Sequence, residues 1–575
     1  MGSHADGKPS FVSDVIDAPA VSAALVVLRD ELTGLRLALE TPGASAGRAM
    51  RDELVGQVDD YLLPRLRRMD APLLMVVGGS TGAGKSTLVN SLVGAQVTAA
   101  GVLRPTTRAP VLACNPADVR SFEDDRVLPG LARTTGGPAG PGGLQLVPTG
   151  GLPAGVALLD APDIDSVVEA NRALAGKLLA AADSWLFVTT AARYADAVPW
   201  DLLHAARDRG TSLSVVLDRV PPDAVEDVSG HLRAMLAERG LADTPVLVVR
   251  ETALDGGLLP AAELAPVRAW LDELAADAQA RAGIVRRTLS GALDSMPRRV
   301  GVVRDALAEQ AAVGEALAAA VESAYRDALD EVDATVRDGS LLRGEVLARW
   351  HDVVGTGDVM RSIETRVGWV RDRLRSLVTG APPADAELRT AVESGVEAVV
   401  HAAADAAAER VAARWRQEPA GHAVLAEVAR PEQASPELSA AVSDMVRDWQ
   451  GHVFELVRSE AAGKRTTARL ASLGVNGAGL TVMIAVFAST GGLTGAEVVV
   501  AGGTSALSQR LLEAIFGDQA VRTLAARARE DLLARVARLL AGEARRYERP
   551  LEDASPPAGA GERLADALTA VEPVR

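Results

Sequence analysis

Apolar residues recur at helical spacing in the first part of the chain. Val21, Leu25 and Leu28 are three or four residues apart, and the apolar positions of residues 54–66 repeat in the same way. This spacing places apolar side chains on one face of a helix. Residues 41–43, Thr-Pro-Gly, interrupt the pattern, so we expect one helix before them and one after them.

A different pattern begins after Pro72. Residues 73–77 form a short apolar run without alternation, which is typical of a strand buried on both faces of a parallel sheet. Helical stretches separate most of the similar runs that follow, at residues 156–159, 185–188, 213–217 and 245–249. This order predicts an α/β fold, with a doubly wound, mostly parallel sheet, over residues 71–270. Within it, residues 134–151 are rich in Gly and Pro, and we expect a mobile insertion there.

The strand pattern stops after Glu263, and helical spacing takes over. Apolar stripes at intervals of three and four cover residues 363–377, 388–399 and 521–539. The C-terminal half is therefore predicted to be long helices, with a break at the Gly-Thr-Gly of residues 355–357. From Pro550 onward, Pro, Gly and acidic residues predict a loose, flexible tail.

Composition narrows the possible functions. Aromatic residues make up 3% and hydrophobic residues 48%, so Ala, Leu and Val must build the core, which suits close helix packing rather than a β-sandwich. The formal charge of −16 argues against nucleic acid as a partner. Cys114 is the only cysteine, which excludes an intrachain disulfide and fits a reducing compartment. The seven histidines show no zinc-ligand spacing, and the polar residues 1–9 do not resemble a signal peptide.

One short stretch carries recognisable chemistry. It fits G-x-x-x-x-G-K-[ST] and lies between a predicted strand and an apolar helix, which is the context this motif requires. Its residues are Gly79, Ser80, Thr81, Gly82, Ala83, Gly84, Lys85 and Ser86, followed by Thr87. Backbone N–H groups of such a loop surround phosphates, and the helix N-terminus adds positive potential. We expect Lys85 to reach the β- and γ-phosphates and the Ser86 hydroxyl to bind Mg²⁺.

Two further positions could complete a metal and phosphate site. Asp160 directly follows the apolar run 156–159, where a second metal-side carboxylate belongs; the alternative is an ordinary turn aspartate. Thr107 lies in the sequence Thr-Thr-Arg-Ala-Pro of residues 106–110. A threonine after the P-loop can close over the γ-phosphate and give the metal a hydroxyl; the alternative is a plain loop threonine.

These motifs together resemble the dynamin superfamily, and bacterial dynamin-like proteins in particular. The resemblance rests on the P-loop, Thr-Thr-Arg-x-Pro and Asp-x-Pro within residues 70–260, and on the order of the parts elsewhere. It implies a catalytic site with Lys85, Thr107 and Asp160, and a metal site with Ser86, Thr107 and Asp160. It also implies a P-loop GTPase domain at residues 71–270, N-terminal helices 1–70 packed with a neck, a helical neck and trunk at 271–549, and the tail 550–575.

The chain departs from the family pattern in the catalytic loops. The family has Asp-x-Pro-Gly where this chain has Asp160-Ala161-Pro162-Asp163, which adds a carboxylate beside the γ-phosphate. We count Asp163 among the nucleotide-binding residues, where it either turns outward or helps to position water. A serine that orients the attacking water in many dynamins is replaced by Gly82.

The base-reading motif is also altered. GTPases carry Asn/Thr-Lys-x-Asp after this strand, whereas residues 218–221 are Asp-Arg-Val-Pro. Arg219 is expected to stack on the base, and Asp218 or Asp223 to replace the missing carboxylate. Guanine specificity is therefore implied by the resemblance alone. Residues 251–253, Glu-Thr-Ala, match the place of the last base-contacting loop, although a helix N-cap at Thr252 explains them equally well.

An apolar segment lies near the C-terminus. Residues 470–496, which follow Arg469, include no charged residue, and Gly491-Gly492 divide the stretch. We expect a helical hairpin at about residues 470–512 that touches lipid, with basic residues at the headgroups. A helix pair buried in the trunk and a true membrane span are the alternatives. The expected lipid-contacting residues of this tip are Leu480, Val482, Ile484, Val486 and Phe487.

The first hypothesis is a cytoplasmic dynamin-like GTPase, peripheral to the inner face of the cell membrane, that binds GTP or GDP with Mg²⁺. It would form a homo-oligomer or pair with a related dynamin-like chain, and hydrolyse GTP slowly without assembly. The second is a scaffold that binds nucleotide with negligible hydrolysis and acts as a protein-interaction module. An RNA-associated GTPase would need a basic appended domain, which the acidic helical half does not supply.

Overall fold

The computed structural model describes residues 17–98, 109–162 except 125, 126, 129, 138 and 141, 169–337, 384–462 and 518–572. They form two compact units. The sheet unit comprises the described residues of 1–36, 43–308 and 557–575, and the helical unit those of 37–42 and 309–556.

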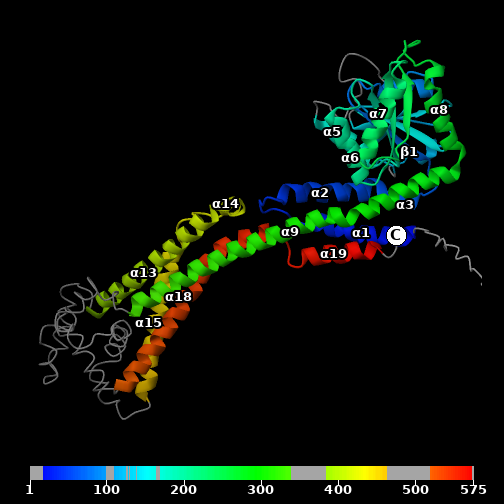
Figure 1. Cartoon of the computed structure of the whole chain (residues 1–575). Helices are drawn as coiled ribbons and strands as arrows, with labels where there is room; N and C mark the ends of the chain where they lie inside the picture. The colour runs from blue at the N-terminus through cyan, green and yellow to red at the C-terminus, as the bar shows by residue number, and fades with distance from the viewer. Residues whose placement is uncertain are drawn as a thin grey trace, which may run out of the picture. The chain divides into compact units, whose positions relative to one another are not determined.

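The sheet unit is built on eight strands in the order β3-β4-β2-β5-β1-β6-β7-β8. Strand β1 of this sheet is labelled in Figure 1. All neighbouring strands are parallel except β2 and β5, which are antiparallel. The strands are β1 (Leu73–Gly79), β2 (Val111–Cys114), β3 (Ala132–Thr135), β4 (Gly143–Pro148), β5 (Val156–Asp160), β6 (Ser184–Thr190), β7 (Ser212–Val220) and β8 (Val246–Arg250). The prediction of a doubly wound, mostly parallel sheet is confirmed.

Helices cover both faces of this sheet. Leu74 and Val76 of β1 belong to a core cluster with α5 (Glu169–Ala180), α6 (Ala197–Asp208) and α7 (Val225–Glu238). Met75 and Val77 alternate with them and are equally buried, so the opposite face is covered as well. There α4 (Lys85–Val93) contacts β1, β5 and α8 (Ala261–Ala276). Burial on both faces explains the continuous apolar run of this strand.

Two parts of the sheet unit differ from the predictions. Residues 134–151 were expected to be a mobile insertion, but β4 and the end of β3 lie within them. The short strand β3, Ala-Arg-Thr-Thr, has no apolar run because it forms an edge of the sheet. The suggested N-cap at Thr252 is also wrong, because α8 begins at Ala261.

The N-terminal helices confirm the pattern read from the sequence. They are α1 (Ala18–Gly34), α2 (Ala44–Gln57), the π-helical turn η1 (Val58–Leu62) and α3 (Leu63–Arg67). The expected loose tail is wrong, since α19 (Ala560–Val571) packs along α1. Its Leu564 is completely buried, and Val571, one heptad later on the same face, is buried too.

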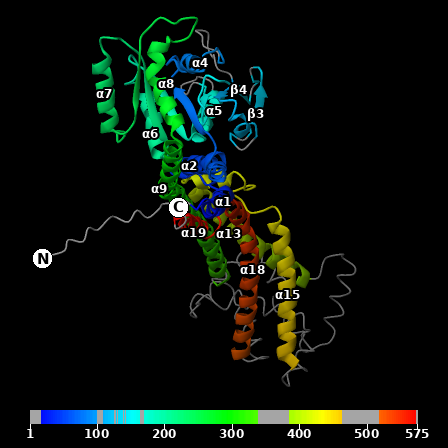
Figure 2. The ribbon, with the colours of Figure 1, turned by 90° about the vertical axis from the view of Figure 1, so that its right-hand side faces the viewer.

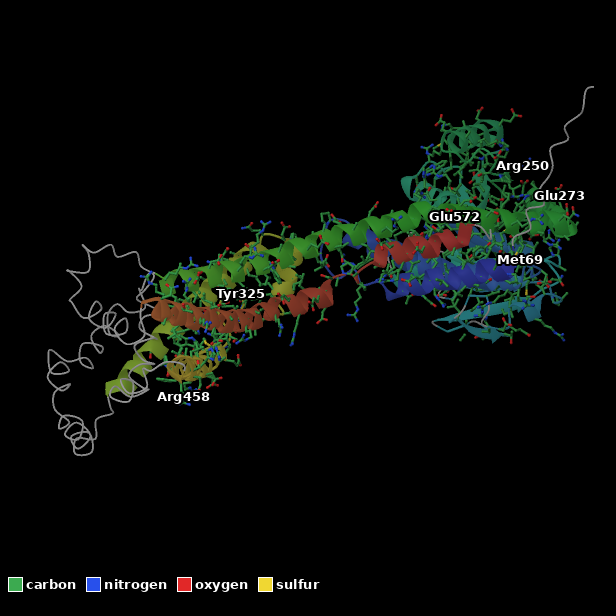
Figure 3. The ribbon with its side chains drawn as sticks, turned by 90° about the horizontal axis from the view of Figure 1, so that it is seen from below. Met69, Arg250, Glu273, Tyr325, Arg458 and Glu572 are labelled. Atoms are coloured by element: carbon green, nitrogen blue, oxygen red, sulfur yellow. The ribbon has the colours of Figure 1, made fainter. Side chains whose placement is uncertain are left out.

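The helical unit contains the rest of α9 (Ala278–Arg337), α13 (Ala384–Trp415), α14 (Pro419–Leu425), α15 (Leu438–Ala462) and α18 (Asp518–Ala554). The helices α15 and α18 lie side by side (Figure 2). Five alanines of α13 are buried in the core of this unit, which confirms the use of small residues there: Ala403, Ala404, Ala407, Ala408 and Ala412. Tyr325 of α9 is labelled in Figure 3, and its ring centroid lies 6.2 Å from that of Tyr547 in α18. The Trp415 indole N–H donates to Leu317 O over 3.1 Å.

A buried ion pair joins the amino ends of the strands to helices. The Arg65 guanidinium of α3 lies 3.0 Å from the Asp183 carboxylate, and both side chains are almost fully buried. Asp183 Oδ2 accepts a hydrogen bond from Leu74 N over 2.7 Å, and its carbonyl accepts one from the Thr288 hydroxyl of α9 over 2.8 Å. Burial raises the pKa of Asp183, and the charge of Arg65 opposes that rise. The pair therefore fixes α3 to the start of β1 and β6, and the Asp183 backbone carbonyl adds a bond to α9.

We predict that Asp183→Asn destabilises the sheet unit by about 3 kcal/mol or more, because it leaves a buried Arg65 without a counter-charge. Thermal unfolding of the full chain measures this as a lower transition midpoint. Asp30→Asn is the matched control, because Asp30 pairs with Arg29 on the surface, where such pairs contribute little. An Asp183→Asn variant as stable as the control would contradict the prediction.

Candidate nucleotide site

The loop between β1 and α4 has a backbone that only glycine adopts readily. Gly79, Gly82 and Gly84 have φ angles of 148°, 77° and 98°. A Cβ atom on Gly79 would lie 2.2 Å from the carbonyl oxygen of Val188 in β6. A Cβ atom on Gly84 would lie 2.5 Å from Asp218 Oδ2. The glycines thus allow neighbouring strands to approach the loop closely, as the P-loop interpretation requires.

The Lys85 ammonium group lies inside this loop. Lys85 begins α4 and is 5% exposed. Its Nζ donates to the carbonyl oxygens of Gly79 over 2.8 Å and Ser80 over 3.0 Å. A positive charge is therefore held among the first amides of a helix, where an anion is stabilised. This geometry fits the predicted role of Lys85 toward phosphate.

The next residue meets a carboxylate from another strand. Ser86 Oγ lies 2.8 Å from Asp160 Oδ2, and Asp160 is completely buried at the end of β5. The β1–β5 register places Val77 opposite Asp160, so both strands end at the same edge of the sheet. A hydroxyl and a carboxylate side by side are oxygen ligands that suit Mg²⁺. Ser86 and Asp160, the two described members of the predicted metal site, thus lie together.

The described parts of the chain hold no group of three or more His, Cys, Asp or Glu side chains arranged to bind a metal. Magnesium in phosphate-transfer sites commonly takes one or two protein ligands, with phosphate oxygens and water completing its shell. The pair formed by Ser86 and Asp160 fits that kind of site and would require a phosphate ligand.

The predicted base-side residues also reach the P-loop. Strand β7 extends through Asp218 and Arg219 to Val220, with an irregular register against β8. Arg219 has a φ of 54°, and its guanidinium donates to the carbonyl oxygen of Gly82. Asp218 Oδ1 accepts from the Arg219 amide over 2.9 Å. Burial raises the pKa of Asp218, whereas the hydrogen bonds and charge of Arg219 lower it.

This arrangement gives Arg219 a contact that the sequence did not predict. Its guanidinium supports the P-loop backbone, while stacking on a base remains a prediction. Arg193, which follows β6, makes a similar contact: its Nη1 donates to Thr81 O over 2.9 Å. The sequence offered no signal for Arg193 beyond its position after a predicted strand.

A second missed residue is Thr98. Its hydroxyl donates to Asp160 Oδ2 over 2.6 Å, and its side chain is buried. Asn90 of α4 is bonded to the backbone of Thr98 and Val97. The sequence signal was only a hydroxyl residue between the P-loop helix and residues 106–110.

Several predicted residues lie outside the described residues. These are Thr107, Asp163 and the tip residues Leu480, Val482, Ile484, Val486 and Phe487. No helix in the described ranges has the length and hydropathy to cross a membrane, and residues 470–512 are not part of those ranges.

Comparisons with known proteins were made with the sequence and with the structure. No protein-family model matches the chain, and no curated protein matches it. Among solved structures, one of an oligomerised bacterial dynamin pair, described as providing a mechanism for long-range sensing and tethering of membranes, matches 98% of this chain and 96% of its own. The identity is 10% and the TM-score 0.40. The match extends over nearly the whole of both chains.

Two further solved structures match with lower TM-scores. LeoA, a bacterial dynamin GTPase from ETEC, matches 97% of this chain and 98% of its own at 10% identity and a TM-score of 0.24. Toc33 from Arabidopsis thaliana, in complex with Mg²⁺ and GMPPNP, matches 40% of this chain and 92% of its own at 17% identity and a TM-score of 0.23.

Proposed function

We propose that the chain is a dynamin-like GTPase that binds GTP and GDP with Mg²⁺ at its P-loop. The observation that carries this proposal is the contact of Ser86 Oγ with Asp160 Oδ2, 2.8 Å apart, beside the buried ammonium of Lys85. A phosphate-binding loop and a metal-side carboxylate, far apart in the sequence, thereby share one edge of the sheet.

The described residues would divide the work as follows. Lys85, whose Nζ donates to the carbonyl oxygens of Gly79 and Ser80, would also reach the β- and γ-phosphate oxygens. Ser86 and Asp160 would hold Mg²⁺, and a bound Mg²⁺ would supply positive charge next to the phosphates. Backbone amides of the loop and of the first turn of α4 supply the remaining contacts. Positioning and electrostatics, rather than covalent chemistry, would drive the reaction.

Hydrolysis is expected to be slow in the isolated chain. Gly82 offers no side chain to orient the attacking water, which then depends on groups beyond the P-loop. The closing of Thr107 over the γ-phosphate is part of this proposal, as is Asp163, which would either turn outward or help to position water. We expect assembly of two or more chains, either copies or a related dynamin-like chain, to raise the rate.

Guanine rather than adenine is the proposed base. This choice rests on the motif resemblance, while the position of Arg219 and Asp218 against the P-loop supports a base site at the end of β7. Pro221 occupies the place of the usual guanine-reading carboxylate, so another acidic group must take that role.

The alternative is a scaffold that binds nucleotide but hydrolyses it negligibly. The absence of a side chain at residue 82 favours it specifically, because water would lack one of its orienting groups. Phosphate release measured with and without lipid vesicles separates the two functions. The scaffold predicts no release above background in either condition.

We predict that Lys85→Ala weakens GTP binding by on the order of tenfold to a hundredfold, the loss expected for hydrogen bonds between charged groups. Titration of the full chain with GTP and, separately, with ATP measures both the site and the base preference. Lys177→Ala is a matched control, because Lys177 is an exposed lysine on α5.

Two results would contradict this account of the site. Equal affinity for ATP and GTP would reject guanine specificity and leave the phosphate site intact. Equal weakening by Lys85→Ala and Lys177→Ala would reject the P-loop as the place where the phosphates bind.

We also propose that the chain associates with anionic membranes from the cytoplasmic side. The uncharged segment that follows Arg469 supports this, since Lys464, Arg465 and Arg469 precede it and Arg510 follows it. Apolar residues between lipid tails and basic residues at the headgroups would together supply the affinity. Lipid contact at the tip and nucleotide binding at the P-loop would be coupled through helices.

We predict that Phe487→Glu weakens binding to phosphatidylcholine–phosphatidylserine vesicles by about tenfold or more, because it replaces buried apolar area with a charge. Co-sedimentation of the full chain with such vesicles measures the bound fraction. Val27→Glu serves as the control, since Val27 is 52% exposed on α1. Absence of binding by the unsubstituted chain would instead favour a helix pair buried in the trunk.

A further inference from the structure

The carboxylate at the end of β5 receives two hydroxyl groups on one oxygen atom. Asp160 Oδ2 accepts from Ser86 Oγ over 2.8 Å and from Thr98 Oγ1 over 2.6 Å. Ser86 belongs to the P-loop helix, whereas Thr98 lies beyond the end of that helix. The proposed Mg²⁺ site thus includes a neighbour that the P-loop motif does not contain.

Thr98 is held in place by the same helix. Asn90 of α4 is completely buried, and its Oδ1 accepts from the amides of Val97 over 2.8 Å and Thr98 over 2.9 Å. Its Nδ2 donates to the Thr98 carbonyl over 2.9 Å. The Asn90 side chain thus accepts two hydrogen bonds and donates one, and together they fix the backbone that carries the Thr98 hydroxyl.

Because this cluster is buried, the Thr98 hydroxyl has a strong effect on the orientation of the Asp160 carboxylate. Asp160 is completely buried and Thr98 is 5% exposed. A hydrogen bond in such surroundings is poorly replaced by water, so loss of the hydroxyl should free the carboxylate to turn. Hydrogen-bond partners of metal-binding carboxylates orient them in this way and affect metal affinity strongly.

We propose that Thr98 is a positioning residue that orients the Asp160 carboxylate for Mg²⁺. This inference rests on the proposed nucleotide site, and Thr98 itself touches neither metal nor nucleotide in it. Ser86 reaches Asp160 Oδ2 from the P-loop helix and Thr98 reaches it from the segment after that helix, so the two hydroxyls together hold the direction of the carboxylate. The chain would then bind Mg²⁺ without reorganising the carboxylate.

The test is the Mg²⁺ dependence of binding of fluorescent GDP to the full chain. Thr98→Val removes the hydroxyl at similar size, Thr98→Ala removes it without steric demand, and Thr98→Ser keeps it. We expect Thr98→Val and Thr98→Ala to need about tenfold more MgCl₂, or higher, for half of the Mg²⁺-induced gain in affinity. Affinity in EDTA should be unchanged, and Thr98→Ser should behave as the unsubstituted chain.

Two outcomes would overturn the inference. One is an unchanged Mg²⁺ requirement in both variants that lack the hydroxyl. The other is an equal loss of GDP affinity with MgCl₂ and with EDTA, which would assign Thr98 a purely structural role. If Thr98→Val does not fold, the comparison of Thr98→Ala with Thr98→Ser decides the matter. Failure of the unsubstituted chain to bind GDP at all would instead reject the proposed function.

Discussion

The buried carboxylate of Asp160 is the group on which the proposed function depends. A buried charge is unfavourable unless polar groups surround it, and the hydroxyls of Ser86 and Thr98 supply two such contacts. Ser86 follows β1 and Asp160 ends β5, and these strands are neighbours in the sheet. The order of strands thus brings the P-loop and the metal-side carboxylate together at the carboxyl edge, where ligands of doubly wound sheets bind.

The amino ends of the strands, at the opposite end of the same sheet, are fixed to helices. The Arg65–Asp183 pair holds α3, and Gly210 and Gly291 bring α9 so close to the turn before β7 that a Cβ on Gly210 would lie 2.2 Å from the Gly291 backbone. Strand β1 connects the two ends of the sheet. At its amino end Leu74 N donates a hydrogen bond to Asp183, and at its carboxyl end Gly79 begins the P-loop.

Much of this architecture follows from local sequence patterns, and the rest required tertiary structure. Strand β1 was predictable because burial on both faces demands an apolar run, whereas β3 has Arg133 and Thr134 and gave no such signal. Helix α19 was missed because Pro557 and Gly559 suggested a tail, although Leu564 and Val571 already had helical spacing.

The candidate site shows the same division between local and tertiary information. Lys85 and Ser86 were predictable from a contiguous motif, and Asp160 was predictable from its place at the end of a strand. Thr98 and Arg193 lie outside any motif, and only the fold brings them to Asp160 and Thr81. Their contacts join segments that are far apart in the chain, and the pattern of a single sequence does not show which distant segments lie close together.

The central claim is that Ser86 and Asp160 act as one Mg²⁺ site for a bound nucleotide. A double-mutant cycle tests it most directly, with GDP affinity measured in MgCl₂ and in EDTA for Ser86→Ala, Asp160→Asn and the double variant. The account predicts that either substitution removes most of the Mg²⁺-induced gain and that the second adds little. Additive losses, or a full Mg²⁺ effect in Asp160→Asn, would contradict it.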